Sequence, residues 1–302
     1  MMVAYIDGHR DEFGVESICN VLPIAPSTYY ASKTAEPSAR AQRDLVMMPI
    51  LMALFVANYR VYGARKLWIA ARRAGHEIGR DQVARLMKAL DIEGVTRRRK
   101  RVWTTVRDDA AARSPDLVKR NFTADAPNDL WVTDLTYVPT WAGVAYVCFI
   151  VDVYSRMIVG WRCAAHMRTD MVLDALHMAA WNRGDLDLEG LRAHSDAGSQ
   201  FTSILWGEQL AQLGAVPSIG TVGDSYDNAL AETVNGYYKA ELIYGPEQGP
   251  WHNVDEVELA TLAWVYWHNN QRLHSHCGDV PPAEFEDTYT AQQADQLLVG
   301  NP

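Results

Sequence analysis

The sequence predicts a protein of the α/β class, in which a mixed sheet flanked by helices follows an all-helical segment. Two observations support this fold class. From Trp131 onward, strand-like and helical runs follow each other in the order β-β-β-α-β-α-β-α, which is typical of a mixed five-stranded sheet with helices packed on it. Before that point, residues 45–95 show helical periodicity only.

Charge is unevenly distributed along the 302 residues, whose net charge is −9. Residues 45–120 hold 17 Lys and Arg against 7 Asp and Glu, whereas residues 121–302 hold 7 against 24. This asymmetry indicates that the basic segment binds a polyanion and that the acidic part collects metal-binding carboxylates.

We expect a cytosolic protein with no membrane partner. No secretory signal opens the chain, and the longest apolar run, Val46–Ala57, is too short to span a bilayer. The four cysteines are scattered without a CxxC pair, which favours reduced thiols. The predicted domains are a helical extension with a linker at 1–44, a basic helical segment at 45–101, a linker at 102–126, a sheet-containing core with a C-terminal helix at 127–287, and a tail at 288–302.

The basic segment is predicted to contain three helices. The first covers Leu45–Asn58, the second covers Ala64–Ala74 and ends at Gly75, and the third begins after Asp81 as N-cap. The short connection between the second and third helices resembles a helix-turn-helix, whose second helix enters the major groove of DNA.

A run of five cations follows these helices. Consecutive cations repel one another and do not pack in a core, so phosphate contacts explain them better than a solvated tail does. The predicted phosphate contacts are Arg97, Arg98, Arg99, Lys100 and Arg101.

The core is predicted to open with three strands joined by short connections, which form an antiparallel meander. These strands are Trp131–Pro139, Val144–Val153 and Met157–Cys163. The elements expected after them are a helix at Thr169–Asn182, a strand at Leu191–His194, a helix at Ser203–Leu213, a strand at Val216–Ile219, a helix within Gly223–Glu241 and a helix at Asp255–Asn269.

Three acids of the core are candidate metal ligands. Asp134 lies in the middle of a strand, Asp196 directly follows another, and Glu232 lies on a later helix. A buried carboxylate must be paired, hydrogen-bonded or metal-bound, and hard oxygen ligands favour Mg²⁺ or Mn²⁺. Two such ions, roughly 4 Å apart, stabilise the attacking and leaving oxygens of a phosphoryl transfer. Asp152, in another strand, is assigned a turn or supporting role instead.

The helix that carries Glu232 has one polar face. Asn228, Glu232, Asn235 and Lys239 follow each other at i, i+4, i+7 and i+11. An acid, a cation and two amides on one face suit a polyanion held by a metal, although a solvated face is the ordinary alternative. Asn235 is left without a role.

Three stretches resemble the DDE signature of bacterial insertion-sequence transposases, and most closely that of the insertion-sequence-three family, whose core is similar to retroviral integrase. They are WVTDLTY at 131–137, HSDAGSQFTS at 194–203 and YDNALAE at 226–232. The 35 residues between Asp196 and Glu232 match the family's D-35-E spacing, and Lys239 matches a basic residue two helical turns on. Further matches are YRVYGARKLW at 59–68, NNQRLH at 269–274 and PPAEF at 281–285.

The resemblance implies a ribonuclease H-like core that cleaves DNA strands and transfers them with two Mg²⁺ (or Mn²⁺) ions bound by the three acids. It implies that Asn228 and Lys239 hold DNA near these acids and that the basic segment binds the terminal inverted repeats of the element. Arg65 and Arg272, which lie inside matched motifs, are further predicted DNA contacts.

The family also implies partners. We expect a homo-oligomer on element ends and target DNA in a bacterial cytoplasm. The chain resembles the downstream frame alone, so the upstream-frame protein, or a fusion with it, is a possible partner. Ala197 and Cys277 depart from the residues that many relatives carry, and neither is one of the acids.

Two other functions stay open from the sequence. An element-encoded DNA-binding regulator without activity would explain the basic segment but not the three acids. A metal-dependent nuclease without strand transfer would explain both.

Overall fold

The computed structural model describes residues 2–96, 115–118, 121–184, 188–220, 229–246 and 249–299. The chain forms two compact units, Met1–Ile50 and Leu51–Pro302. Within the described residues, no helix has both the length and the apolar character needed to cross a membrane. All four cysteines are free and buried.

The first unit contains α1 (Met2–Phe13), α2 (Val15–Val21) and α3 (Pro26–Thr34). Its small core is built from Ile6, Ile18, Cys19 and Tyr29. The Tyr29 hydroxyl donates to Asp7 at 2.9 Å, and Lys33 pairs with the same carboxylate at 2.5 Å. These contacts hold α3 against α1.

The predicted helices of the basic segment are present as α4 (Ala39–Ala57), α5 (Ala64–Arg73) and α6 (Arg80–Ala89). Helix α4 begins earlier than the sequence indicated, where the Ser38 hydroxyl accepts the Ala41 N–H at 3.3 Å. The prediction of Asp81 as the N-cap of α6 is wrong. Gly79, whose backbone is extended, holds that position, and Asp81 lies in the first turn.

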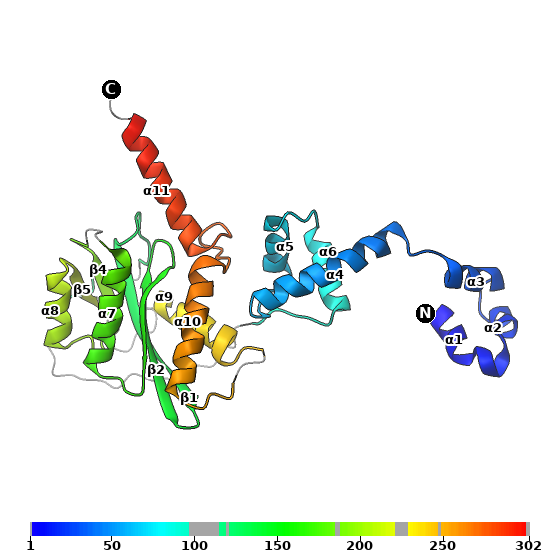
Figure 1. Cartoon of the computed structure of the whole chain (residues 1–302), viewed down its shortest axis with the longest axis horizontal. Helices are drawn as coiled ribbons and strands as arrows, with labels where there is room; N and C mark the ends of the chain where they lie inside the picture. Colours follow the sequence, from blue (N-terminus) through cyan, green and yellow to red (C-terminus); the bar gives the residue numbers. More distant parts are fainter. Residues whose placement is uncertain are drawn as a thin grey trace. The chain divides into compact units, whose positions relative to one another are not determined.

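The sheet of the second unit has five strands in the order β3-β2-β1-β4-β5 (Figure 1). The pairs β1–β2 and β2–β3 are antiparallel, whereas β1–β4 and β4–β5 are parallel. The strands are β1 (Leu130–Thr140), β2 (Gly143–Asp152), β3 (Ile158–Ala164), β4 (Arg192–Ser195) and β5 (Val216–Ile219).

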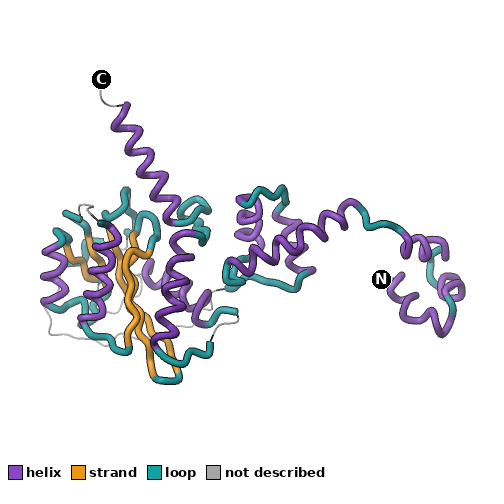
Figure 2. The backbone as a smooth tube through the Cα atoms, viewed as in Figure 1, coloured by secondary structure: helices purple, strands orange, loops and turns teal. Residues whose placement is uncertain are grey.

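Helices cover both faces of this sheet (Figure 2). They are α7 (Thr169–Arg183), α8 (Ile204–Gln212), α9 (Ala229–Tyr238) and α10 (Val254–Asn270). A π-helical turn (Lys239–Ile243) follows α9, and α11 (Pro282–Val299) packs against α10 and extends away from the sheet (Figure 1). The mixed five-stranded sheet flanked by helices, after a helical segment, confirms the predicted fold class. Helix α11 runs beyond residue 287, where the tail was expected to begin.

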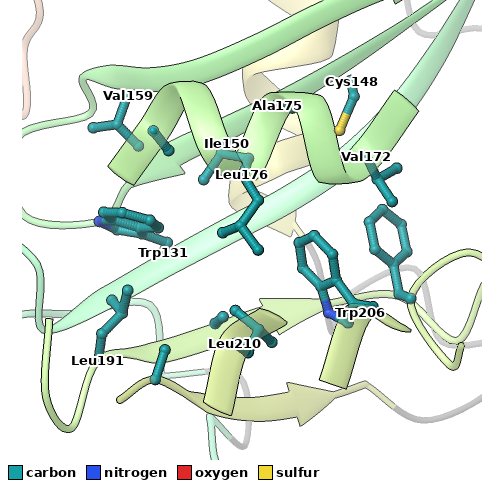
Figure 3. Packing of buried hydrophobic residues seen from close by; sticks show 14 of the residues in the cluster. Trp131, Cys148, Ile150, Val159, Val172, Ala175, Leu176, Leu191, Trp206 and Leu210 are labelled. Carbon is teal, nitrogen blue, oxygen red and sulfur yellow. The ribbon is translucent and has the colours of Figure 1, made fainter. Parts of the chain in front are cut away.

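One face of the sheet packs on α7 and α8. Cys148 and Ile150 of β2 lie there with Leu176 of α7 and Trp206 of α8 (Figure 3). Gly160 of β3 allows the close approach of α7, because a Cβ at this position would lie 2.2 Å from the Ala175 carbonyl oxygen.

The opposite face packs on α9 and α10. Phe149, which alternates with Cys148 and Ile150, lies 5.0 Å from the ring of Tyr238 and 5.9 Å from that of Trp264. These fully buried rings fix α9 and α10 on the sheet. The orientation of α9 determines which of its residues reach the strands.

Candidate active site

The sheet places two of the predicted acids side by side. Asp134 pairs in register with Phe149, so both side chains lie on the face that α9 covers. Thr133 of β1 pairs with Ser195 of the parallel strand β4. Asp134 and Asp196 each follow one member of this pair, and they are therefore neighbours across two parallel strands.

The Asp134 carboxylate is held by two hydrogen bonds. The Leu135 N–H donates to one oxygen at 2.9 Å, and the Asn235 side-chain amide donates to the other at 2.9 Å. Burial raises the pKa of Asp134 to about 8, and the charges of Asp196 and Glu232 add to this rise. Both acids therefore lie within electrostatic range of Asp134.

Asp196 lies in the turn after β4. The Gly198 N–H donates to its carboxylate at 3.1 Å, and a Cβ on Gly198 would lie 3.0 Å from the same oxygen. Burial raises the pKa of Asp196, while the Gly198 N–H and the nearby His194 oppose the rise. His194 is buried, and its Nδ1 lies 2.9 Å from the Ser218 hydroxyl.

Glu232 lies in the first turn of α9 and is exposed. In the part of the chain that the structure describes, no three His, Cys, Asp or Glu side chains are gathered tightly enough to form a complete metal site. The donor set nevertheless suits a hard divalent cation, because oxygen ligands predominate and the carboxylates repel one another. Asp134, Asp196 and Glu232 are the residues that would hold it.

Asn235 is a residue of the site to which the sequence assigned no role. Besides its bond to Asp134, its side-chain oxygen is buried and has no hydrogen-bond partner among the described residues. An orphan buried oxygen is rare in folded proteins and indicates a missing partner such as water or an ion. The sequence signal was its position on the face that carries Glu232.

Lys239, at the start of the π-helical turn, also reaches this region. Its amino group lies 4.5 Å from the centre of the Tyr137 ring on β1. Burial lowers the pKa of Lys239, and the charge of Asp134 opposes this shift. The cation predicted to hold DNA therefore lies close enough to the first acid to feel its charge.

Family models cover the described core and the basic segment. An integrase core domain model matches residues 124–225, a second integrase core domain model matches residues 213–282, and an HTH-like domain model matches residues 42–100. Integrase core domains use divalent metal ions, and the combination with an HTH-like domain implies DNA binding.

Similar proteins are transposases of insertion sequences. The putative transposase for insertion sequence element IS986/IS6110 of Mycobacterium tuberculosis is 53% identical over 275 residues, which cover 90% of this chain and 98% of that protein. The transposase for insertion sequence element IS629 of Shigella sonnei is 45% identical over 295 residues, or 96% of this chain and 97% of that one. The chain belongs to the transposases of the insertion-sequence-three family. It is thus an enzyme of the polynucleotidyl transferase superfamily.

A more distant relative and a solved structure extend the comparison. The transposase InsF for insertion sequence IS3A of Escherichia coli is 28% identical over 294 residues, which cover 95% of this chain and 99% of InsF. The solved structure is the HTLV-2 integrase catalytic core domain in complex with magnesium. Its alignment covers 54% of this chain and 99% of the integrase chain, with 16% sequence identity and a TM-score of 0.41.

Two predicted DNA contacts of the transposase have protein partners. Arg65, which is exposed, makes two hydrogen bonds to Asp279 at 2.8 and 2.6 Å. Arg272 is 3% exposed and binds the carboxylate of Glu241 at 2.6 to 3.0 Å. A DNA contact by either residue stays a prediction. Asn228 and the five cations at 97–101 lie outside the described residues.

The matched motifs of the transposase also join its elements. Asn269 accepts the Ile158 N–H and donates to the Ile158 carbonyl, both at 2.9 Å, which attaches α10 to β3. The Tyr62 hydroxyl accepts the Leu273 N–H at 2.8 Å, so the motifs at 59–68 and 269–274 meet. These residues hold the segment around α5 against the end of α10.

Asp152 has the supporting role expected of it. It is fully buried, accepts the backbone N–H groups of Asn128 and Tyr154 at 2.7 and 2.8 Å, and pairs with Arg183 at 3.0 Å. Arg183 also binds Glu286 of α11 at 2.6 Å. This network connects the end of β2, α7 and α11.

Proposed function

We propose that the transposase cleaves DNA strands and transfers them by in-line phosphoryl transfer, with two Mg²⁺ or Mn²⁺ ions held by Asp134, Asp196 and Glu232. The observation that supports this most strongly is the neighbouring pair of acids, Asp134 within β1 and Asp196 just after β4, with the pKa of Asp134 raised to about 8. Carboxylates in this state gain most from a divalent cation, which removes their mutual repulsion.

The residues of the chain have distinct tasks in this proposal. When bound, the ions supply Lewis acidity at the reacting phosphate and a deprotonated nucleophile. Asn235 orients Asp134 through its side-chain amide, and the Gly198 N–H orients Asp196. Lys239, beside Tyr137, holds a DNA phosphate next to the acids.

The similar proteins are transposases for insertion sequence elements, so we propose terminal inverted repeats and target DNA as the DNA partners. Cleaving two ends and joining them to one target requires coordinated sites, which supports a homo-oligomer on DNA. Joint action with the upstream-frame protein is part of the same proposal.

The test is a reaction of the full chain with short duplexes that carry the element's ends, in Mg²⁺ or Mn²⁺, analysed for cleaved and joined products. Asp196→Asn removes one ligand charge at nearly constant volume. We expect it to lower joining by at least about a thousandfold and to leave the Kd for DNA unchanged. Full activity of this variant would contradict the assignment. Cleavage without joining would indicate a nuclease, and binding alone a regulator.

A further inference from the structure

A cavity lies beside α9, on a different face of the helix from Glu232 and Asn235. It has a volume of about 400 Å³ and is half open to solvent. Lys66 from the start of α5, Arg156 from the β2–β3 turn, and Tyr237 with Glu241 from α9 and the π-helical turn contribute to its wall. The loop after α10 closes it with Arg272.

The cavity has more positive than negative charge. Its described lining holds three cations, Lys66, Arg156 and Arg272, and one carboxylate, Glu241. Arg272 binds that carboxylate with both its Nε and its Nη2, the shortest bond being 2.6 Å. Within the described residues, neither Lys66 nor Arg156 has a carboxylate at ion-pair distance.

The histidines of the lining do not change this balance at neutral pH. Burial, with the nearby charge of Arg272, lowers the pKa of His268 to about 3. Burial also lowers the pKa of His274 well below its ordinary value. Burial lowers the pKa of His276 as well. All three rings are therefore neutral, supply no charge and leave the two cations in excess.

Arg156 is held where it has unused hydrogen-bonding capacity. Its Nη1 is buried and has no hydrogen-bond partner in the described part of the chain, while its Nη2 lies 3.3 Å from His276. Its backbone has a φ of 67°, in the left-handed region that disfavours an arginine. The Arg156 guanidinium lies in a strained turn and has hydrogen-bond donors without a protein acceptor. This combination indicates that Arg156 binds a ligand from outside the protein.

Lys66 shows the same excess of positive charge. Its amino group lies 5.3 Å from the centre of the Tyr62 ring. Burial lowers its pKa to about 8, and the charge of Arg272 adds to this effect. An anion in the cavity would relieve the repulsion between these cations.

We propose that this cavity is a phosphate-binding site, with Lys66 and Arg156 as its ligands. Guanidinium and ammonium groups that converge on one cavity match the oxygens of a phosphate. The source that fits the proposed function is a backbone phosphate of bound DNA, and this assignment rests on that function. Free phosphate has the same chemistry.

The DNA source is tested with Lys66→Met and Arg156→Gln in the full chain. Each change removes one charge and keeps most of the side-chain stem, and thermal unfolding checks the fold. Lys33→Met is the matched control, since Lys33 lies in the first unit and pairs with Asp7. The Kd for a duplex is measured over a series of salt concentrations without divalent metal. For each cavity variant we expect the salt slope to fall by about one and binding to weaken on every sequence alike.

Free phosphate is tested by thermal unfolding with inorganic phosphate in place of chloride at constant ionic strength. Phosphate-dependent stabilisation that both cavity variants lose, with unchanged DNA slopes, assigns the site to free phosphate. If the cavity variants behave like Lys33→Met in both measurements, the proposal is overturned. Neither measurement requires strand joining, so failure of the proposed strand-transfer activity would not affect this test. Likewise, a negative result for the cavity would not contradict the proposed activity.

Discussion

At the scale of single residues, the candidate site depends on how hydrogen bonds orient carboxylates. Asp134 has one oxygen fixed by the N–H of the next residue, Leu135, and the other by Asn235 of α9, which lies 101 residues away in the sequence. These two hydrogen bonds fix the orientation of the carboxylate, so its remaining lone pairs have a defined direction for binding a metal ion. Groups that orient a metal ligand affect metal affinity nearly as strongly as the ligand itself does.

Replacing Asn235 with alanine should therefore weaken the site without removing a ligand. We expect a loss of about 10- to 100-fold in strand joining or in apparent metal affinity, with an unchanged Kd for DNA. The readout is the Mg²⁺ concentration that gives half-maximal joining, which should rise in the variant. Asn270→Ala is the control, because Asn270 is exposed and donates only to Tyr266 of its own helix among the described contacts. Equal Mg²⁺ dependence in both variants would contradict the role of Asn235.

His268 should make the fold sensitive to acid. Its folded-state pKa of about 3 lies below the ordinary 6.5, so between these values the unfolded chain binds a proton that the folded chain does not. The contribution of His268 to stability is therefore fully present above pH 6.5. As the pH drops from 6.5 towards 3, the free energy of unfolding decreases by about 1.4 kcal/mol per pH unit for this residue. His268→Gln should make the decrease shallower in denaturant unfolding at several pH values. The exposed His177→Gln is the control, because the His177 ring contacts the neutral Gln209. Identical pH profiles for wild type and His268→Gln would refute the assignment.

At the scale of elements, buried ion pairs determine where helices attach to the sheet. Glu241 and Arg272 join the π-helical turn to the end of α10. Arg183 joins Asp152 of β2 to Glu286 of α11. In both cases, a charged side chain at the end of one element is neutralised by another that is distant in sequence.

Arg183→Met should destabilise the second unit strongly. The change leaves the fully buried Asp152 and the nearby Glu286 without their cation, which costs about 3–5 kcal/mol. The measurement is the free energy of unfolding in urea. Arg168→Met, at an exposed arginine, should change it by less than about 0.5 kcal/mol. If Arg183→Met lowered the free energy of unfolding by no more than Arg168→Met does, the ion-pair network would contribute little to stability.

At the scale of the whole molecule, basic and acidic residues lie in different parts of the chain. The basic residues are concentrated in 45–120 and the acids in 121–302, so in the proposed function one region holds DNA while the other binds the metal ions. The HTH-like model matches 42–100 and the integrase core models match 124–225 and 213–282, in keeping with this division.

The cations at 97–101 should account for a large share of the salt dependence of DNA binding. Replacing all five with Gln should reduce the salt slope by up to about 4.5, because each phosphate contact contributes about 0.9. The Kd is measured by fluorescence anisotropy over a salt series. A slope equal to that of the wild type would show that these cations do not contact phosphate.

The sequence by itself determined the fold class and the succession of strands and helices along the chain, because hydrophobic alternation and turn residues are local properties. It also singled out the three acids as candidate ligands, which stays a prediction. It also placed Asn235 on the same helix face as Glu232. It misplaced the N-cap of α6, since both Gly79 and Asp81 are residues that begin helices and only the backbone conformation distinguishes them.

Only the tertiary structure decided what these residues contact. That Asp134 and Asp196 are neighbours depends on the parallel pairing of β1 with β4, and the bond from Asn235 depends on how α9 packs on Phe149 and Trp264. Arg272 appeared as a DNA contact in the sequence and lies in a buried pair with Glu241 in the fold. Such contacts join residues distant in the chain, so their partners follow from packing and not from local pattern.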